Sequence, residues 1–189
     1  PAPGATSWSY TLVAAGFTCL EVPLNSPRAL ESIRRLRDAM DGRAVVGAGT
    51  VLTPSAAQDV ADAGGQLVIS PNVDPRVIER ARALGLFTMP GFFTPTEAFT
   101  ALEAGADVLK LFPAELAGPG AVKAIKAVLP KGQPVYAVGG VDPDNMGAWR
   151  AAGADGFGIG SALYRPGRTA DEVGAAACAF VAAWFGSGQ

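Results

Sequence analysis

The sequence predicts an α/β fold, and within that class a (β/α)₈ barrel of parallel strands. Short runs rich in β-branched and aromatic residues alternate with longer, alanine-rich amphipathic segments. The short runs are apolar on both faces, which is typical of parallel strands covered on both sides. Seven such runs recur about every 20 residues, and this favours a barrel over an open doubly wound sheet.

An open sheet that binds a dinucleotide would carry a GxGxxG motif after its first strand. Two segments begin in this way, Gly47-Ala48-Gly49 and Gly158-Ile159-Gly160, but neither continues with the third glycine in place. The dinucleotide fingerprint is therefore absent, and the barrel remains the preferred prediction.

The predicted strands span residues 17–24, 44–51, 66–71, 87–92, 108–113, 134–141 and 156–161. The predicted helices between them span residues 27–39, 54–63, 75–84, 95–104, 119–128 and 144–152. Five of these six helices start with proline, whose missing N–H costs nothing in the first turn. Most of them end at an Ala-Gly or Leu-Gly turn, so the repeating unit is strand, short loop, helix and glycine turn.

Seven strands are one fewer than a (β/α)₈ barrel needs. Residues 6–15 have the pattern of a helix that precedes the strand at 17–24, so the strand not accounted for is the first one. We expect it to lie upstream of Pro1, because a barrel open by one strand would expose two unpaired edges. The alternative is a barrel that is built differently.

The composition bounds the class of protein. A chain of 189 residues fits one domain, 1–189, and its 49% apolar residues without a long uninterrupted apolar run predict a packed core and no membrane partner. The start of the chain lacks the charged and apolar regions of a secretory signal peptide. A net charge of -2 without a basic cluster argues against nucleic acid.

The cysteine and histidine content narrows the chemistry. Cys19 and Cys178 lie far apart and outside any CxxC motif, which fits a reducing cytosol better than a disulfide framework or a zinc site. The chain has no histidine, so Ser-His and Cys-His catalytic pairs are excluded and the commonest transition-metal ligand is missing. We therefore predict no metal, and assign any acid–base chemistry to carboxylates, lysine, tyrosine or water.

Lys110 lies in the middle of the apolar run ADVLKLFP. A buried ammonium is costly unless it is paired or neutral, and a neutral lysine amine can add to a ketone to form a Schiff base. Glu21 stands in the same way amid apolar residues of the strand at 17–24, and it is the natural proton carrier where histidine is absent. If both side chains point into the barrel, they meet near its C-terminal mouth. The alternatives are a structural ion pair and a lysine that extends to solvent from a strand edge.

Glycine-rich segments end the last two predicted strands, at residues 137–141 and 158–162. Barrels frequently bind phosphate through these two loops, whose bare backbone allows close approach. We therefore predict a phosphate site there, with tight turns as the alternative explanation.

Weaker candidates follow other strands. Thr50 could hold a substrate carboxylate or cap the next helix, while Phe92, Phe93 and Phe112 could line the pocket or belong to the core. Asp142 has the pattern of a helix cap.

Several segments, in this order, resemble the class I 2-keto-3-deoxy-6-phospho-sugar-acid aldolases, and among them the phosphogalactonate aldolases. They are AGFTCLEVPLNSP (14–27), VVGAGTVLTP (45–54), SPN (70–72), PGFFTPTEAFTALEAGADVLKLFPAE (90–115), VKAIKAVLP (122–130), YAVGGV (136–141) and GIGSALYRPG (158–167). The similarity covers nearly the whole chain from about residue 11, and the combination of LEVPLNSP, GAGTVL and LKLFP is specific.

The resemblance implies that Lys110 forms the Schiff base and that Glu21 is the acid and base. It also implies substrate-binding roles for Thr50 near the pyruvyl carboxylate, for Pro71 and Phe112 in the pocket, and for Gly139, Gly140, Gly160 and Ser161 on the phosphate. The implied reaction is reversible cleavage of a phosphorylated keto acid to pyruvate and glyceraldehyde 3-phosphate, in a homotrimer without a metal or organic cofactor.

The chain departs from the family pattern in one respect. In the phosphogalactonate branch the carboxylate-binding arginine lies on the first strand, in a pattern like ILRG, and no such strand occurs in this sequence. Three functions therefore remain open: a phosphogalactonate aldolase, an aldolase for the phosphogluconate epimer or for both epimers, and a phosphosugar-binding barrel without turnover.

Overall fold

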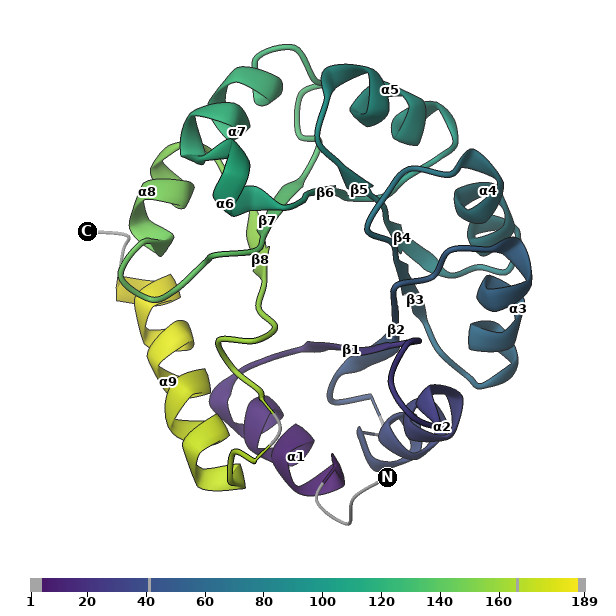
Figure 1. Ribbon diagram of the computed structural model, residues 1–189, viewed down its shortest axis with the longest axis vertical. Helices are drawn as coiled ribbons and strands as arrows, with labels where there is room; N and C mark the ends of the chain where they lie inside the picture. Colours follow the sequence, from purple (N-terminus) through teal and green to yellow (C-terminus); the bar gives the residue numbers. More distant parts are fainter. Residues whose placement is uncertain (1–4, 41, 166, 187–189) are drawn as a thin grey trace.

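Parallel strands surround the centre of the molecule, and helices form a layer outside them (Figure 1). The computed structural model describes residues 5–40, 42–165 and 167–186. Two four-stranded parallel sheets follow one another in the order β1-β2-β3-β4 and β5-β6-β7-β8. The strands are β1 (Cys19–Pro23), β2 (Val45–Gly49), β3 (Leu67–Ile69), β4 (Phe87–Met89), β5 (Gly91–Phe92), β6 (Leu109–Leu111), β7 (Val135–Val138) and β8 (Gly156–Gly158). The predicted α/β barrel architecture is confirmed.

Each of the seven predicted strand segments contains an observed strand, but residues 87–92 contain two, β4 and β5. Pro90 separates them because proline has no N–H to donate to the ladder. Its carbonyl still accepts a hydrogen bond from the Lys110 N–H at 3.0 Å, and the Thr88 carbonyl accepts one from Val108 at 3.1 Å. The two sheets therefore form one continuous wall.

The wall is open on one side. Within the described ranges, no strand pairing links β1 to β8. The additional first strand that we expected upstream of Pro1 lies outside the described residues.

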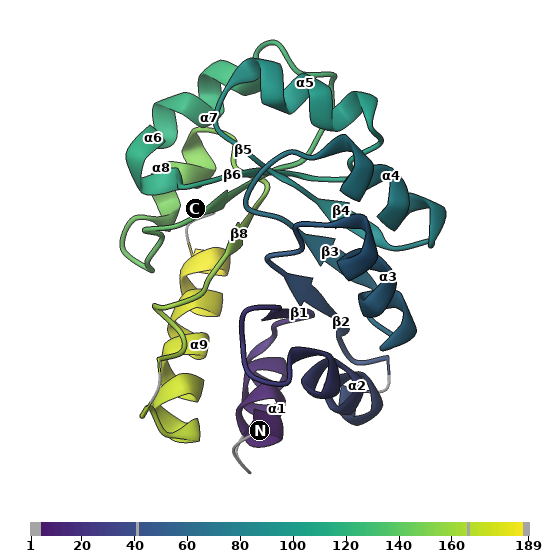
Figure 2. The ribbon, with the colours of Figure 1, turned by 45° about the vertical axis from the view of Figure 1, so that its right-hand side comes forward.

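The helices are α1 (Ala5–Ala15), α2 (Ala29–Met40), α3 (Pro54–Asp62), α4 (Pro75–Ala83), α5 (Pro95–Glu103), α6 (Ala114–Ala117), α7 (Pro119–Lys126), α8 (Met146–Ala151) and α9 (Ala170–Gly186). The sequence did not predict α6 and α9. One turn is too short to show a helical period, and α9 is apolar on nearly all sides, without an amphipathic stripe. α1 and α9 lie side by side outside the open part of the wall (Figures 1 and 2). None of the helices in the described part is long and apolar enough to cross a membrane.

The predicted start of α2 is wrong by two residues. Pro27 was expected in its first turn, but Arg28 has a φ of 53°, which is left-handed and cannot belong to a right-handed helix. The helix therefore begins at Ala29. In α3, α4, α5 and α7, proline does occupy the first turn, as the sequence predicted.

Side chains of the strands alternate between two apolar environments. Residues such as Val46, Val68, Leu109, Leu111 and Val135 point outward and pack against the helices. Leu67, Ile69, Met89 and Val108 form a separate cluster, with Tyr136 packed against it. Because neighbouring residues of a strand point to opposite faces, this second cluster lies on the inner face and lines the interior of the barrel, here called the lumen.

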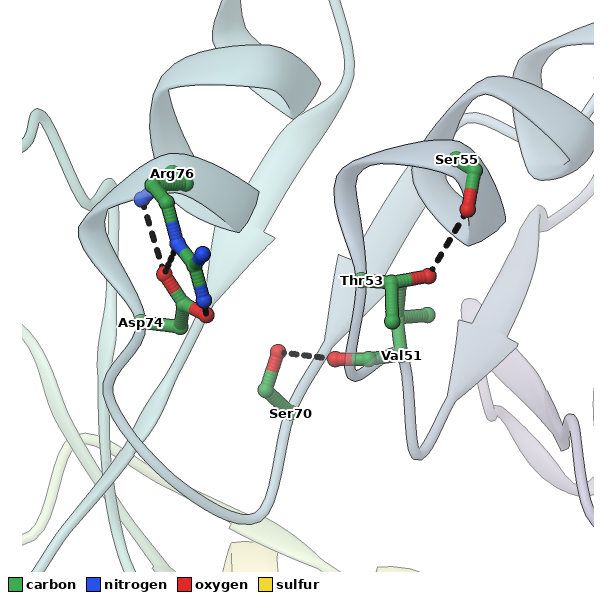
Figure 3. Close-up of polar contacts among 6 residues, drawn as sticks. All are labelled: Val51, Thr53, Ser55, Ser70, Asp74 and Arg76. Atoms are coloured by element: carbon green, nitrogen blue, oxygen red, sulfur yellow. Dashed lines mark hydrogen bonds and ion pairs between the residues drawn. The ribbon is translucent and has the colours of Figure 1, made fainter.

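Polar side chains fix the loops that leave β2 and β3 (Figure 3). Thr53 caps α3 by accepting a hydrogen bond from the Ala56 N–H at 3.1 Å, and Asp74 caps α4 by accepting one from Arg76 at 3.0 Å. The buried Ser70 hydroxyl donates to the Val51 carbonyl at 2.9 Å and so joins the two loops. These contacts hold the C-terminal ends of the strands, where the candidate site lies.

Candidate active site

Lys110 is the middle residue of β6, and its side chain points into the lumen. Its strand neighbours Leu109 and Leu111 belong to the outer core, while Val108, two residues earlier, belongs to the lumen cluster. Lys110 is only 9% exposed, and its Nζ lies 4.6 Å from the centre of the Phe112 ring. The ring face weakly favours the ammonium, but no ion pair to Lys110 occurs among the described residues. The structural ion pair that we considered is thus not formed.

The strands on either side of Lys110 place a glycine and a tyrosine beside it. In the sheet register Lys110 lies beside Gly91 of β5 and Tyr136 of β7, and Tyr136 lies beside Gly156 of β8. A Cβ on Gly156 would overlap the Tyr136 ring, so the tyrosine ring fills the space that a side chain at residue 156 would occupy. The lysine and the tyrosine therefore share one level of the lumen wall.

Glu21 is the middle residue of β1, and its carboxylate lies against β2. A Cβ on Gly49 would overlap Glu21 Oε2 and would lie 2.5 Å from the carboxyl carbon. Only glycine at this position leaves the space that the carboxylate occupies. Glu21 as a whole is exposed, because β1 is the edge strand of its sheet, but its carboxylate is packed closely against β2.

Thr50 follows β2 with a φ of 57°. A left-handed conformation is uncommon for a β-branched residue, and such strain is found preferentially at functional sites. The alternative role that we considered, capping the next helix, is wrong because Thr53 makes that cap. The half-buried Thr50 thus lies at the C-terminal mouth without a capping role.

Pro71 lies at the same mouth, directly after Ser70, whose hydroxyl joins the β2 and β3 loops. A Cβ on Gly91 would lie 2.5 Å from the Pro71 carbonyl oxygen, so this glycine allows the loop to approach β5 closely. Among the phenylalanines, Phe112 lies beside Lys110, whereas Phe92 is buried in the outer core and Phe93 is exposed. Of the three, the structure brings only Phe112 to the lysine.

The two glycine loops extend from the paired ends of β7 and β8, where Val138 lies beside Gly158. Gly139 and Gly140 have φ values of 107° and 67°, which side-chain-bearing residues rarely adopt. The Asn145 side chain donates to the Gly140 carbonyl at 2.8 Å, and Arg165 donates to the Ser161 carbonyl at 3.0 Å. Gly140, Gly160 and Ser161 are exposed. The loops are therefore adjacent, held in place and accessible, as a phosphate site requires.

The aldolase family model described as KDPG and KHG aldolase matches residues 4–174. The chain belongs to this family. It is thus an aldolase, a carbon–carbon lyase, as the sequence motifs had indicated.

Known proteins similar in sequence and structure support the assignment of this chain to the aldolase family. The chain is 48% identical over 173 residues to the 2-dehydro-3-deoxy-6-phosphogalactonate aldolase of Escherichia coli strain K12, which covers 92% of this chain and 84% of the relative. A solved native KDPGal structure superposes with a TM-score of 0.97 at 45% identity, over 99% of this chain and 91% of that one.

A more distant relative is the KDPG aldolase of Legionella pneumophila, which was captured with pyruvate as a covalent carbinolamine. It superposes with a TM-score of 0.83 at 27% identity, over 93% of this chain and 87% of that one.

The electrostatics of the aldolase lumen favour uncharged forms of both candidate groups. Burial lowers the pKa of Lys110, and the nearby charge of Glu21 opposes this shift only in part. Burial likewise raises the pKa of Glu21, against the opposing effect of the Lys110 charge. Desolvation dominates in both cases, so the lysine amine is more easily neutral and the carboxyl is more easily protonated than in water.

The sequence analysis did not identify several residues of the candidate site. In the GAGT segment only Thr50 was predicted to bind substrate, and Gly49 was not. The signal for a close approach was that Gly47 and Gly49 both occupy lumen-facing positions of one strand. Tyr136 carried no signal, since an aromatic residue in a strand is ordinary. The prediction that Asp142 caps the next helix is wrong, because Asn145 is the N-cap of α8; the Asp142 carboxylate instead accepts a hydrogen bond from the Asn145 N–H at 2.8 Å in the turn before the helix.

Proposed function

We propose that this protein is a class I aldolase that reversibly cleaves 2-keto-3-deoxy-6-phosphogalactonate to pyruvate and D-glyceraldehyde 3-phosphate. The observation that carries the proposal is the desolvated lumen lysine, Lys110, coupled electrostatically to Glu21. The similarity to the phosphogalactonate aldolase of Escherichia coli supports the substrate. The covalent pyruvate adduct of the Legionella relative supports the chemistry.

The reaction begins at the Lys110 amine. The neutral amine attacks C2 of the keto acid to give a carbinolamine, which loses water to become an iminium ion. Glu21, as a carboxylate, accepts the proton of the C4 hydroxyl while the C3–C4 bond breaks. The electron pair of that bond moves into the iminium to give an enamine, and glyceraldehyde 3-phosphate leaves. Protonation at C3 by the Glu21 carboxylic acid and hydrolysis of the resulting imine release pyruvate and restore Lys110.

The remaining site residues bind the two ends of the substrate. Thr50 and Pro71 contact the pyruvyl end, and Phe112 lines the wall beside the reacting lysine. Gly139, Gly140, Gly160 and Ser161 bind the phosphate through the adjacent loops after β7 and β8. The proposed acid–base and Schiff-base steps use only side chains of this chain.

Borohydride reduction in the presence of pyruvate tests the proposal. The reduced imine should appear on the Lys110 peptide by mass spectrometry, and Lys110→Met should abolish it. Lys123→Met, which removes an exposed lysine of α7, is the matched control and should trap pyruvate normally. Turnover is then measured with both C4 epimers. A folded protein that traps no pyruvate would favour a phosphosugar-binding barrel, and faster cleavage of the phosphogluconate epimer would reassign the substrate.

We also propose that the chain acts in the cytosol as a single-domain subunit of a homotrimer. Both cysteines, Cys19 and Cys178, are free thiols, as is usual in a reducing compartment. Large apolar side chains remain exposed on the single chain, among them Leu116 at 75% and Val128 at 59%, and a subunit interface would cover such surface. Light scattering coupled to gel filtration tests the trimer; a monomer at micromolar concentration would contradict it.

A further inference from the structure

The Glu115 side chain lies against the first of the two glycine loops. Glu115 belongs to the short helix α6, which directly follows the strand that carries Lys110. A Cβ on Gly139 would overlap Glu115 Oε2, and a Cβ on Gly140 would lie 2.5 Å from Glu115 Cβ. The carboxylate therefore occupies the space over the Gly139 backbone, and the stem of the side chain occupies the space over Gly140.

This position brings a negative charge to the surface at which a phosphate is expected. Glu115 is exposed, and no ion pair or hydrogen bond to its carboxylate occurs within the described ranges. Its charge therefore has no ionic or hydrogen-bonding partner in the part of the chain that the structure describes. A phosphate and a carboxylate are both oxyanions that accept hydrogen bonds from backbone N–H groups, so they suit the same bare glycine backbone. Two like charges at such short range repel each other.

We propose that Glu115 is a specificity-determining residue that competes with the substrate phosphate for the Gly139–Gly140 loop. The inference rests on the proposed function, because it takes this loop as the phosphate site. Without a phosphorylated ligand the carboxylate covers the loop, and the incoming phosphate displaces it. Glu115 then weakens the binding of the phosphorylated end of the substrate and leaves the pyruvate end unaffected.

The packing permits this displacement without a change in the backbone. The Cβ of Glu115 is held next to Gly140, whereas the carboxylate is the far end of a flexible side chain. Rotation about the Cα–Cβ and Cβ–Cγ bonds moves the carboxylate away from Gly139 while Cβ stays in place. The loop itself is held by another residue, because Asn145 donates to the Gly140 carbonyl at 2.8 Å. The glutamate is thus the movable partner and the loop is the fixed one.

Neutral substitution at residue 115 separates this role from a structural one. Glu115→Gln keeps the size of the side chain and removes its charge, and Glu115→Ala removes both. We expect the dissociation constant of inorganic phosphate, measured by titration calorimetry on the full chain, to fall about fivefold in both variants, the effect of removing a displaced carboxylate about 8 Å from a doubly charged phosphate in water. Glu103→Gln removes one exposed negative charge at the end of α5 and serves as the control, with phosphate binding unchanged.

The second test measures the kinetics of the condensation reaction, in which the aldehyde is a substrate. The KM of D-glyceraldehyde 3-phosphate should fall about fivefold in Glu115→Gln, while the KM of pyruvate and of unphosphorylated D-glyceraldehyde should not change. The inference is overturned if phosphate binding is the same in the wild type and Glu115→Gln, if neither binds phosphate, or if both aldehydes respond equally. Pyruvate trapping on Lys110 is scored separately. If trapping fails while phosphate binding tightens in Glu115→Gln, only the aldolase proposal is refuted.

Discussion

Gly49 gives the sharpest test of how the site is built, because it is the residue that makes room for the Glu21 carboxylate. In Gly49→Ala, the new Cβ would lie 2.5 Å from the carboxyl carbon of Glu21, and ordinary contact begins at 3.4 Å. The carboxyl carbon must therefore retreat by about 0.9 Å, and Oε2, which the new Cβ would overlap, must move farther. Gly49 does not have a left-handed φ, so alanine introduces no backbone strain. The three atoms nearest to the new methyl group all belong to Glu21, so the perturbation falls first on that side chain.

The expected loss follows from this displacement. A misplacement of about 1 Å in a catalytic group costs about 100-fold, so kcat/KM for cleavage of the phosphorylated keto acid should fall about 100-fold in Gly49→Ala. Trapping of pyruvate on Lys110 should remain close to that of the wild type, because the amine that forms the imine is not displaced. Carbon–carbon cleavage is thus expected to suffer while Schiff-base formation survives.

The assay couples pyruvate release to its reduction by NADH, and borohydride trapping is measured in parallel. Gly120→Ala is the matched control, since a Cβ there meets nothing within 4 Å and the position is not left-handed. It should retain full activity. Wild-type kcat/KM in a folded Gly49→Ala protein would refute the argument that Gly49 positions a catalytic Glu21.

Three further substitutions test the proposed roles. Lys110→Met should reduce turnover by at least about 10⁴-fold. The urea midpoint of unfolding should not fall, since an apolar side chain suits the lumen. Turnover at the wild-type rate would show that Lys110 takes no part in the mechanism. Glu21→Gln should lower kcat by about 10²- to 10⁴-fold. Because the Glu21 charge raises the Lys110 pKa, its removal should also shift the pH midpoint of pyruvate trapping to lower pH, and an upward shift would contradict the coupling. Ser70→Ala should lower the free energy of unfolding in urea by about 1–3 kcal/mol, because the buried Val51 carbonyl loses its hydroxyl donor. The exposed Ser55→Ala should cost under about 0.5 kcal/mol, and equal losses in the two serine variants would show that burial does not matter here.

Local pattern predicted most of the fold. The helix α4 was expected at 75–84 and spans Pro75–Ala83, because a proline, an apolar period and a terminal glycine turn are all encoded within a few residues. Most strands are shorter than expected at both ends, since flanking apolar residues belong to the adjoining loops; β6 spans Leu109–Leu111 within the expected 108–113. The break at Pro90, the left-handed Arg28 and the one-turn helix α6 were missed.

The sequence likewise predicted some residues of the candidate site and missed others. Lys110 was found because a charge in the middle of an apolar strand is visible in one dimension, and strand alternation then placed it in the lumen. Glu21 was found by the same argument. Gly49 and Glu115 were not, because their contacts join residues of different strands and loops. The glycines of β2 signal a close approach, but the local sequence does not show which side chain fills the space, and nothing local marks the Glu115 contact.

The sequence by itself thus determined the barrel class, the family and the two charged residues of the lumen, since each depends on periodicity or on motifs read along the chain. The tertiary structure alone decided which glycine accommodates the Glu21 carboxylate, which threonine caps α3, and which acidic side chain covers the Gly139–Gly140 loop. The physical reason is that close packing and desolvation depend on distances between residues far apart in the chain, and only the folded chain sets those distances.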